Sequence, residues 1–216
     1  MSYYMPRPSR PFFVPILLIL NLLVFLGWQL ANGAQEQWMA DNFTLSWMGL
    51  TEGRYWTLMS SVFSHNWLIH FFINMFVLRS FGTLLEEVLG RARFILFYLM
   101  AGLSGSIVHI FVSEFILHIP EQAALGASGA IAGLVLVFSL VFPREKILIF
   151  GIIPVPAILG AFAFVGLDIW GLVAQAEGGG LPIGHGAHLG GAAAGILFYF
   201  FYLRPRLRRR RPIELI

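Results

Sequence analysis

The sequence predicts an all-α membrane protein built as a bundle of six transmembrane helices. Of its 216 residues, 58% are hydrophobic and only 12% are charged, and the mean hydropathy is +0.78. A soluble domain carries about 25% charged residues, and a soluble fold of this size cannot bury so much apolar surface. Long charge-free windows separate the charges along the chain. These observations indicate that the bilayer is the solvent.

Six apolar windows mark the spans, since each reaches about the 20 residues that a helix needs to cross the hydrocarbon core. We predict helices near residues 11–31, 62–83, 93–114, 126–142, 146–173 and 185–203. The short connections leave no room for a second domain. The prediction is therefore one membrane domain over 11–203, between an N-terminal segment, 1–10, and a basic tail, 204–216. The lack of an internal repeat counts against an inverted-repeat transporter.

The basic residues predict that both termini are cytoplasmic, because Lys and Arg concentrate in cytoplasmic loops. Of the 14 basic residues, only Arg54 lies on the opposite side in the six-helix arrangement. The arginine-rich tail is expected to contact anionic lipid rather than nucleic acid. The chain has no cysteine, which excludes disulfides, thiolate metal sites and a cysteine nucleophile.

Ionisable and hydrogen-bonding side chains inside the spans are costly, so they are the first candidates for function. They are His65, His70, Asn74, His109, Ser128, Asp168, His185 and His188. Three of them, His70, Ser128 and His188, each lie sixteen residues before a charge on the cytoplasmic side, on helices that run in the same direction. At 1.5 Å per residue they share one depth, about 24 Å above that side. This register favours a common site.

Glycines beside Ser128 and His188 predict that their helices touch. Pairs of glycines four residues apart are Gly129 with Gly133, Gly186 with Gly190, and Gly191 with Gly195. Small residues at this spacing let membrane helices approach backbone to backbone, although each pair alone is also typical of ordinary helix packing. With these faces in contact, Ser128 can reach His188.

The chemistry of these side chains indicates nucleophilic catalysis. A serine hydroxyl becomes a nucleophile when a base lies beside it, and histidine suits that role near neutral pH. We therefore interpret Ser128 as the nucleophile and His188 as its general base. Gly126 allows a tight turn that leaves the Ser128 backbone N–H free to stabilise an oxyanion. His70 and Asn74, four residues apart on one helix face, can also donate hydrogen bonds there.

At these residues the sequence resembles the rhomboid family of intramembrane serine proteases, over roughly residues 50–203. The matching motifs are His65 with His70 and Asn74 in the second helix, Gly126-Ala127-Ser128-Gly129 in the fourth, and Ala187-His188-Leu189-Gly190 in the sixth. The Gly-x-Ser-Gly tetrapeptide alone is a weak signal in a glycine-rich chain. Three motifs in order, on the second, fourth and sixth helices, are a strong one.

The resemblance implies an endopeptidase that cuts transmembrane segments of membrane proteins near the outer leaflet with a Ser–His dyad. It implies no third acid, and Asp168, on the fifth helix, is not expected to orient His188. Substrates are expected to enter beside the fifth helix, which Pro154 and Pro156 can kink. The expected location is the cell membrane (plasma or inner), with the active site facing outside. Transmembrane substrates and the bilayer are the expected partners, with no cofactor, metal or nucleic acid.

Other positions carry structural roles by resemblance. Glu86 matches an acidic position that ties the cytoplasmic ends of helices together, and Arg54 resembles the arginine of a Trp-Arg pair in the first loop. The remaining structural positions are His65, Gly126, Gly129 and Gly190. The sequence departs from the family at Gly53, where tryptophan is frequent, and at Ala132, where many members place an aromatic ring against the catalytic histidine.

Alternatives to the serine protease interpretation differ in the residues that they require. A non-catalytic, client-binding relative typically lacks the serine or the histidine, and this chain keeps both. A transporter or channel that moves protons through buried histidines predicts polar residues down to the cytoplasmic side, whereas here they cluster at the outer end. A zinc protease is disfavoured because there is no His-Glu-x-x-His, and the histidines lack an acidic partner nearby in sequence. His185, three residues before His188, stays open as a rival base.

Overall fold

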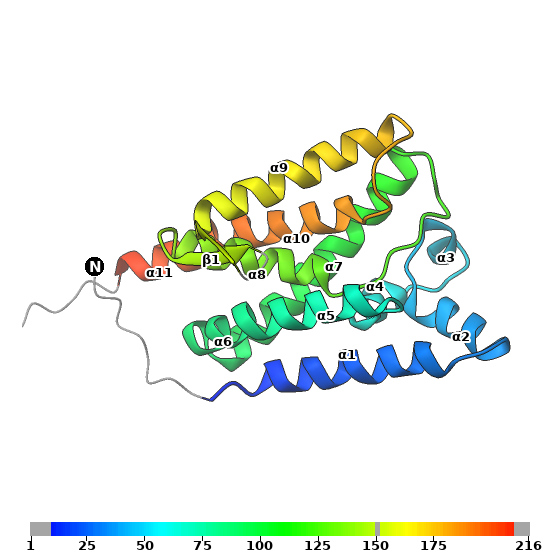
Figure 1. The fold of residues 1–216 in the computed structure, drawn as a ribbon, viewed down its shortest axis with the longest axis horizontal. Helices are drawn as coiled ribbons and strands as arrows, with labels where there is room; N and C mark the ends of the chain where they lie inside the picture. Colours follow the sequence, from blue (N-terminus) through cyan, green and yellow to red (C-terminus); the bar gives the residue numbers. More distant parts are fainter. Residues whose placement is uncertain (1–9, 150–151, 210–216) are drawn as a thin grey trace, which may run out of the picture.

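The computed structural model describes residues 10–149 and 152–209, and a helical bundle accounts for most of them (Figure 1). The predicted segment 1–10, except for its last residue, and the tail beyond residue 209 lie outside the described residues. The elements are α1 Phe13–Leu30, α2 Ala34–Phe43, α3 Trp47–Thr51, α4 Thr57–Ser60, η1 Ser61–Phe63, α5 Leu68–Val77, η2 Leu78–Gly82, α6 Thr83–Leu89, α7 Arg91–Phe115, α8 Ser128–Val141, β1 Lys146–Ile149, β2 Ile153–Pro156, α9 Ala157–Ala176, α10 His185–Leu197, η3 Phe198–Leu203 and α11 Arg204–Arg209.

The described part of the chain contains five helical segments that are long and apolar enough to cross a membrane. They are Phe13–Leu30, Leu68–Leu89, Arg91–Phe115, Ala157–Ala176 and His185–Leu207. α8 is a shorter apolar helix of 14 residues, which packs against α7, α9 and α10. The predicted all-α membrane bundle is confirmed, whereas the side of the membrane on which the termini lie stays a prediction.

The second predicted helix begins at Leu68 rather than near residue 62. The chain leaves the helical conformation at Ser64, whose φ and ψ are −101° and 136°. The Trp28 indole N–H of α1 donates to the Ser64 hydroxyl at 2.8 Å, and the next residue, His65, is fully buried. The break therefore directs polar groups into the bundle before α5 begins.

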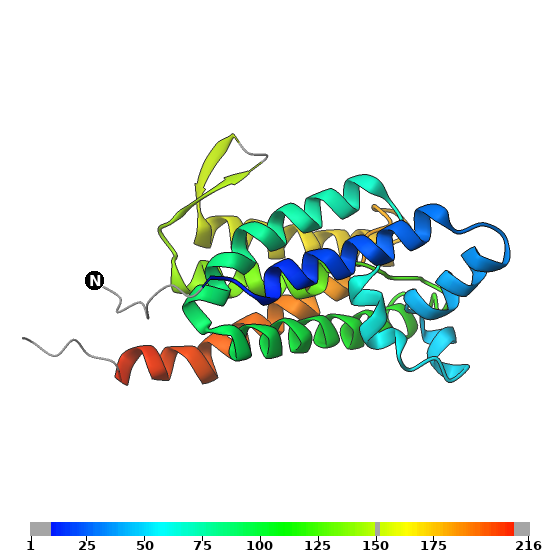
Figure 2. The same cartoon turned by 90° about the horizontal axis from the view of Figure 1, so that it is seen from below.

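The fifth predicted helix is wrong at its start, because Lys146–Ile149 and Ile153–Pro156 pair as the antiparallel strands β1 and β2 (Figure 2). Pro154 and Pro156 have no amide N–H, so they cannot donate the bonds that a helix interior needs. Ile153 and Val155 are β-branched and favour extended backbone. α9 begins directly after the second proline, so the prolines shape a hairpin instead of kinking a helix.

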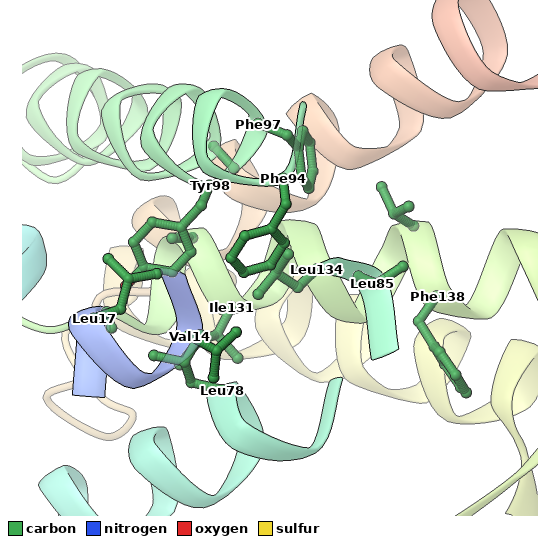
Figure 3. Packing of buried hydrophobic residues seen from close by; sticks show 14 of the residues in the cluster. Val14, Leu17, Leu78, Leu85, Phe94, Phe97, Tyr98, Ile131, Leu134 and Phe138 are labelled. Carbon is green, nitrogen blue, oxygen red and sulfur yellow. The ribbon is translucent and has the colours of Figure 1, made fainter. Parts of the chain in front are cut away.

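The packed apolar core includes side chains of α1, η2, α7 and α8 (Figure 3). Val14 and Leu17 of α1 meet Phe94 and Tyr98 of α7, and Leu134 of α8 closes the cluster; none of the five is more than 2% exposed. This part of the core thus joins α1 to α7 and α8.

Glu86 joins two helix ends beside this core. Its carboxylate accepts the backbone N–H groups of Phe12, Phe13 and Val14 at 2.8, 2.8 and 2.9 Å. The first-turn amides of a helix have no partners within it, and a negative charge suits a helix N-terminus. The fully buried Glu86 of α6 therefore caps α1 and ties the two helices together.

α8 and α10 touch through their backbones. A Cβ added to Gly191 would lie 1.8 Å from the Gly129 carbonyl oxygen, and one added to Gly195 would lie 2.7 Å from that of Gly133. The helix contact that the glycine pairs predict is confirmed. α7 joins the same group, since a Cβ on Gly190 would lie 2.7 Å from the Ser104 carbonyl oxygen.

Candidate active site

Ser128 is the first residue of α8, and the loop that leads to it is held by backbone hydrogen bonds. Leu45, between α2 and α3, and Ala124 exchange N–H···O bonds of 2.9 and 2.8 Å. The Gly126 N–H donates to the carbonyl of Ser61 in η1 at 2.9 Å. Because Ser128 lies in the first helical turn, its own N–H has no acceptor within the helix. The chain thus presents a hydroxyl and a backbone donor at one fixed point.

Gly126 allows this turn and the approach of His70. Its φ is +125°, which only glycine adopts readily, and a Cβ there would lie 2.6 Å from His70 Cε1. Asn74, one turn further along α5, is 4% exposed and donates through Nδ2 to the His70 carbonyl at 2.9 Å. The structure therefore places His70 beside the turn before Ser128, with Asn74 bonded to its own helix.

His65 supports the same turn from the break before α5. Its Nε2 accepts the Ala127 N–H at 3.4 Å, and its ring centroid lies 5.0 Å from that of His70. His65 precedes the membrane span that begins at Leu68. Burial, and secondly the charge of His70, lower the pKa of His65 to about 3. His65 is thus held neutral, which leaves Nε2 free to accept a hydrogen bond.

The folded protein is expected to lose stability as the pH falls from 6.5 toward 3, the interval between the ordinary and lowered pKa of His65. In this interval the unfolded chain takes up a proton that the folded protein excludes, so unfolding becomes easier by up to about 1.4 kcal/mol per pH unit. Thermal unfolding in detergent over this range measures the effect. His65→Gln removes the titrating group and should flatten the dependence, whereas an equal pH dependence in both proteins would contradict it.

His188 lies in the first turns of α10, 15% exposed, and meets a carboxylate from α9. Its Nδ1 lies 2.9 Å from Asp168 Oδ1, and His185 Nδ1 lies 2.7 Å from the same oxygen. This corrects the expectation that no acid orients His188. α9 runs beside α10 (Figure 1), so Asp168 reaches His188 across the helix contact although twenty residues separate them in sequence. An N–H at Nδ1 leaves Nε2 of His188 as the basic nitrogen.

α9 encloses His185 more tightly than His188. A Cβ added to Gly171 would lie 2.3 Å from His185 Nε2, so one ring nitrogen meets Asp168 and the other packs against helix backbone. His185 is 8% exposed and is poorly placed as the rival base. Sequence reasoning missed this contact, although a carboxylate and a glycine three residues apart lie on one helix face. A carboxylate inside a span also requires a partner.

Phe164 supplies the aromatic contact that Ala132 cannot make. Its ring centroid lies 5.6 Å from that of His188, with the planes 31° apart. Ala132 is buried in α8. The ring beside the histidine therefore comes from α9, an arrangement that sequence comparison at one position cannot reveal.

The carboxylate and the two imidazoles could also hold a metal ion, since one ligand atom from each lies within 4.8 Å of the others. The acidic partner that the histidines lack in sequence is thus present in space. The two N···O distances of 2.7 and 2.9 Å are hydrogen-bond lengths, whereas ligand atoms around tetrahedral zinc stand about 3.3 Å apart. This geometry fits a shared hydrogen-bond acceptor better than a metal centre.

Ser128 and His188 line one cavity of about 1140 Å³, together with His70, Asn74 and Gly126. Residues of α5 and α9 line this cavity together with residues of α7, α8 and α10, and β1 borders it. Within the residues described, no hydrogen bond joins the Ser128 hydroxyl to His188 directly. Such bonds are often long in hydrolases without substrate.

Arg54 of the first loop forms ion pairs with Asp41 and Glu52. Gly53 beside it has a φ of +88°, which strains any residue with a side chain. The departure from tryptophan at this position therefore follows from the local backbone. The two ion pairs of Arg54 stabilise the loop between α2 and α4.

Comparisons with known proteins agree with the family resemblance. A model of the rhomboid domain matches residues 52–205. The chain is similar to RHOMBOID-like protein 12, mitochondrial, of Arabidopsis thaliana, with 31% identity over 89% of this chain and 59% of the relative. It is 33% identical to Rhomboid protein 1, mitochondrial, of Saccharomyces cerevisiae, over 97% of this chain and 58% of the relative. Rhomboid protease GluP of Bacillus subtilis is 30% identical over 58% of this chain and 24% of its own length.

The chain thus spans about three fifths of the length of the first two relatives. Both carry mitochondrial names, which contradicts the predicted location in the plasma membrane. The physical reason for the error is that Lys and Arg report which way a chain crosses a membrane and carry no information about which membrane it crosses.

Proposed function

The chain belongs to the rhomboid family, and on that premise we propose that it is an intramembrane serine endopeptidase that cleaves transmembrane segments of other membrane proteins. One observation carries the proposal: Ser128, at the start of α8, and His188, on α10, line the same cavity between α5 and α9. A cavity walled by two membrane-crossing helices is suited to an extended segment that enters from the bilayer.

In the proposed reaction the Ser128 Oγ attacks the scissile carbonyl carbon while His188 Nε2 takes the hydroxyl proton. When the tetrahedral intermediate collapses, the C–N bond breaks and the leaving amine takes that proton from His188. A water molecule then gives a proton to His188 and attacks the acyl-enzyme, and Ser128 leaves with a proton. The cycle needs one imidazole that alternates between base and acid.

Asp168 acts in this proposal as a positioning residue. Its Oδ1 accepts from Nδ1 of His188 at 2.9 Å, which fixes the tautomer that leaves Nε2 free to receive the serine proton. The His185 contact at 2.7 Å holds the carboxylate in turn. The proposed machinery is therefore a Ser–His pair with a buried acid behind the histidine.

The oxyanion that forms during attack needs donors in a fixed place. The backbone N–H of Ser128 is one, because no helix acceptor competes for it. His70, packed over Gly126, is a second. The Asn74 amide donates one N–H to the His70 carbonyl and retains another for the substrate. With the termini on the basic side, this site lies nearer the opposite face of the membrane.

A fluorophosphonate probe tests the proposal, because it labels only activated serines. We expect labelling of the purified protein that is lost in Ser128→Ala and in His188→Ala, with parallel loss of cleavage of a transmembrane substrate. His185→Ala is the matched control, because His185 lies on the same helix as His188 and contacts the same Asp168 carboxylate. This variant should keep labelling. Labelling that persists in Ser128→Ala would refute the nucleophile, and an intact protein with no labelling or cleavage would indicate a non-catalytic client-binding relative.

A further inference from the structure

The β1–β2 hairpin contains prolines at every second position of one strand. The register pairs Lys146 with Pro156 and Leu148 with Pro154. In an antiparallel ladder, pairs that exchange hydrogen bonds alternate with pairs whose N–H and C=O groups point away from the partner strand. Proline has no N–H to exchange, so both of these pairs are expected to be of the second kind.

A hydrogen bond at the base of the hairpin confirms which pairs of residues exchange hydrogen bonds and which do not. The Ala157 N–H donates to the Glu145 carbonyl at 2.7 Å, one position beyond the pair formed by Lys146 and Pro156. Hydrogen-bonded and outward-pointing pairs alternate strictly. The backbone groups of Lys146 and Leu148 therefore point outward from the hairpin, along the free edge of β1.

The two edges of the hairpin differ in what they offer. The outer edge of β2 presents carbonyls without N–H groups, since Pro154 and Pro156 occupy its outward positions, and such an edge resists strand pairing. The outer edge of β1 presents both the N–H and the C=O of Lys146 and Leu148. No other backbone segment among the described residues hydrogen-bonds to these two. Only the β1 edge can accept a third strand on both kinds of group.

The β1 edge borders the cavity that holds Ser128. Lys146, Ile147 and Leu148 line this cavity, and no residue of β2 does. The Ile147 side chain packs against α9, because a Cβ added to Gly160 would lie 2.4 Å from its Cδ1. Leu148, on the opposite face of the strand, is 59% exposed. The hairpin projects from the helices here (Figure 2), so the edge is open to a chain lying along the cavity.

We propose that the free edge of β1 is a binding site for a substrate that crosses the membrane from the Ser128 side toward β1. The segment downstream of its cleaved bond adds to the hairpin as a third strand. The proposal rests on the proposed protease function and extends it to a second contact remote from Ser128. α8 spans about 21 Å between Ser128 and its last residue. An extended chain covers that depth in about six residues and a helix in about fourteen. The paired segment thus begins about six to fourteen residues after the cut.

Strand addition would satisfy unpaired backbone groups on both the substrate and the β1 edge. An apolar segment that unwinds near the membrane surface exposes N–H and C=O groups, which are costly where water is scarce. The β1 edge carries the same unpaired groups. Pairing satisfies both, and it reads backbone rather than side chains, so it fits partners of varied apolar sequence. The edge would then recognise substrates that unwind easily at this depth.

Leu148→Pro tests the edge itself, because it removes one outward N–H and leaves the β1–β2 bonds in place. Leu148→Ala is the matched control, with a shortened side chain and the N–H retained. We expect Leu148→Pro to lower kcat/KM for a transmembrane substrate about 3- to 10-fold, the worth of one hydrogen bond, and Leu148→Ala to change it less than 2-fold. Equal rates in both variants, each with wild-type fluorophosphonate labelling, would overturn the proposal.

Cross-linking keeps the proposal testable if the proline variant fails to fold. The chain has no cysteine, so Leu148→Cys in a Ser128→Ala background gives a single thiol. Substrates with one cysteine at successive positions downstream of the cut should form disulfides at every second position. A period near 3.6, no cross-link, or a cross-link only between two copies of the enzyme would overturn strand addition. If the wild-type protein shows no labelling of Ser128, that result would instead refute the protease function.

Discussion

Gly191→Ala is expected to abolish activity and to leave little folded protein. The new methyl group would lie 1.8 Å from the Gly129 carbonyl oxygen and 2.6 Å from its carbon. Both contacts are backbone, so no side chain can rotate away, and the α8–α10 pair must separate. Overpacking in a core typically costs about 1–3 kcal/mol, and a backbone collision lies at or above the top of that range. Because Gly129 follows Ser128 directly, the separation also moves the serine away from His188.

Thermal unfolding and gel filtration in detergent measure the loss of fold, and fluorophosphonate labelling measures the loss of the site. Gly166→Ala is the matched control, since a Cβ there meets nothing within 4 Å. Alanine within α9 should stabilise the protein slightly, by up to about 1 kcal/mol. A Gly191→Ala protein with wild-type melting and labelling would contradict the backbone contact between α8 and α10.

Asp168→Asn is expected to lower kcat by up to about 10,000-fold, the loss seen when the acid behind a catalytic histidine is replaced by asparagine. The amide can turn an N–H toward His188, which favours the tautomer with the proton on Nε2 and blocks transfer from Ser128. Asp168 is 7% exposed and touches the histidines rather than the substrate. KM should therefore change little, and this split separates a positioning role from a general loss of structure.

Steady-state cleavage of a transmembrane substrate gives kcat and KM, and the melting temperature reports the fold. His185→Ala is the matched comparison, because it removes the other partner of Asp168 and keeps the 2.9 Å contact to His188. We expect this variant to lose less than 10-fold in kcat. A wild-type kcat in Asp168→Asn would contradict the positioning role of Asp168 and would support the Ser–His dyad without a third acid that the family resemblance implies.

Local sequence was sufficient for the features that depend on short-range physics. Hydropathy predicted the five long helices because a bilayer imposes about 20 apolar residues on each crossing helix. Glycine spacing predicted the α8–α10 contact, because small residues four apart form a flat helix face. Ser128 and His188 stood out because a polar group inside a membrane is expensive. These conclusions concern the length, composition and face of single helices.

Sequence alone did not reveal that Lys146–Ile149 and Ile153–Pro156 form paired strands in an apolar window that contains two prolines. Apolar content is equally compatible with a buried strand, so hydropathy cannot distinguish the two. The break before His65 was hidden for a similar reason, because the hydrogen bond that stabilises it comes from Trp28 of another helix.

The side chains that contact His188 could be identified only from the tertiary structure. Asp168 and Phe164 belong to α9, and they reach the histidine only because of the rotation and tilt with which α9 packs on α10. No periodicity within one helix encodes that rotation, which is set by the fit of side chains between helices. The sequence thus indicated which segments are apolar enough to lie in a membrane and which polar side chains they carry. Helix packing determined which of those side chains meet, and it gave His188 an acid.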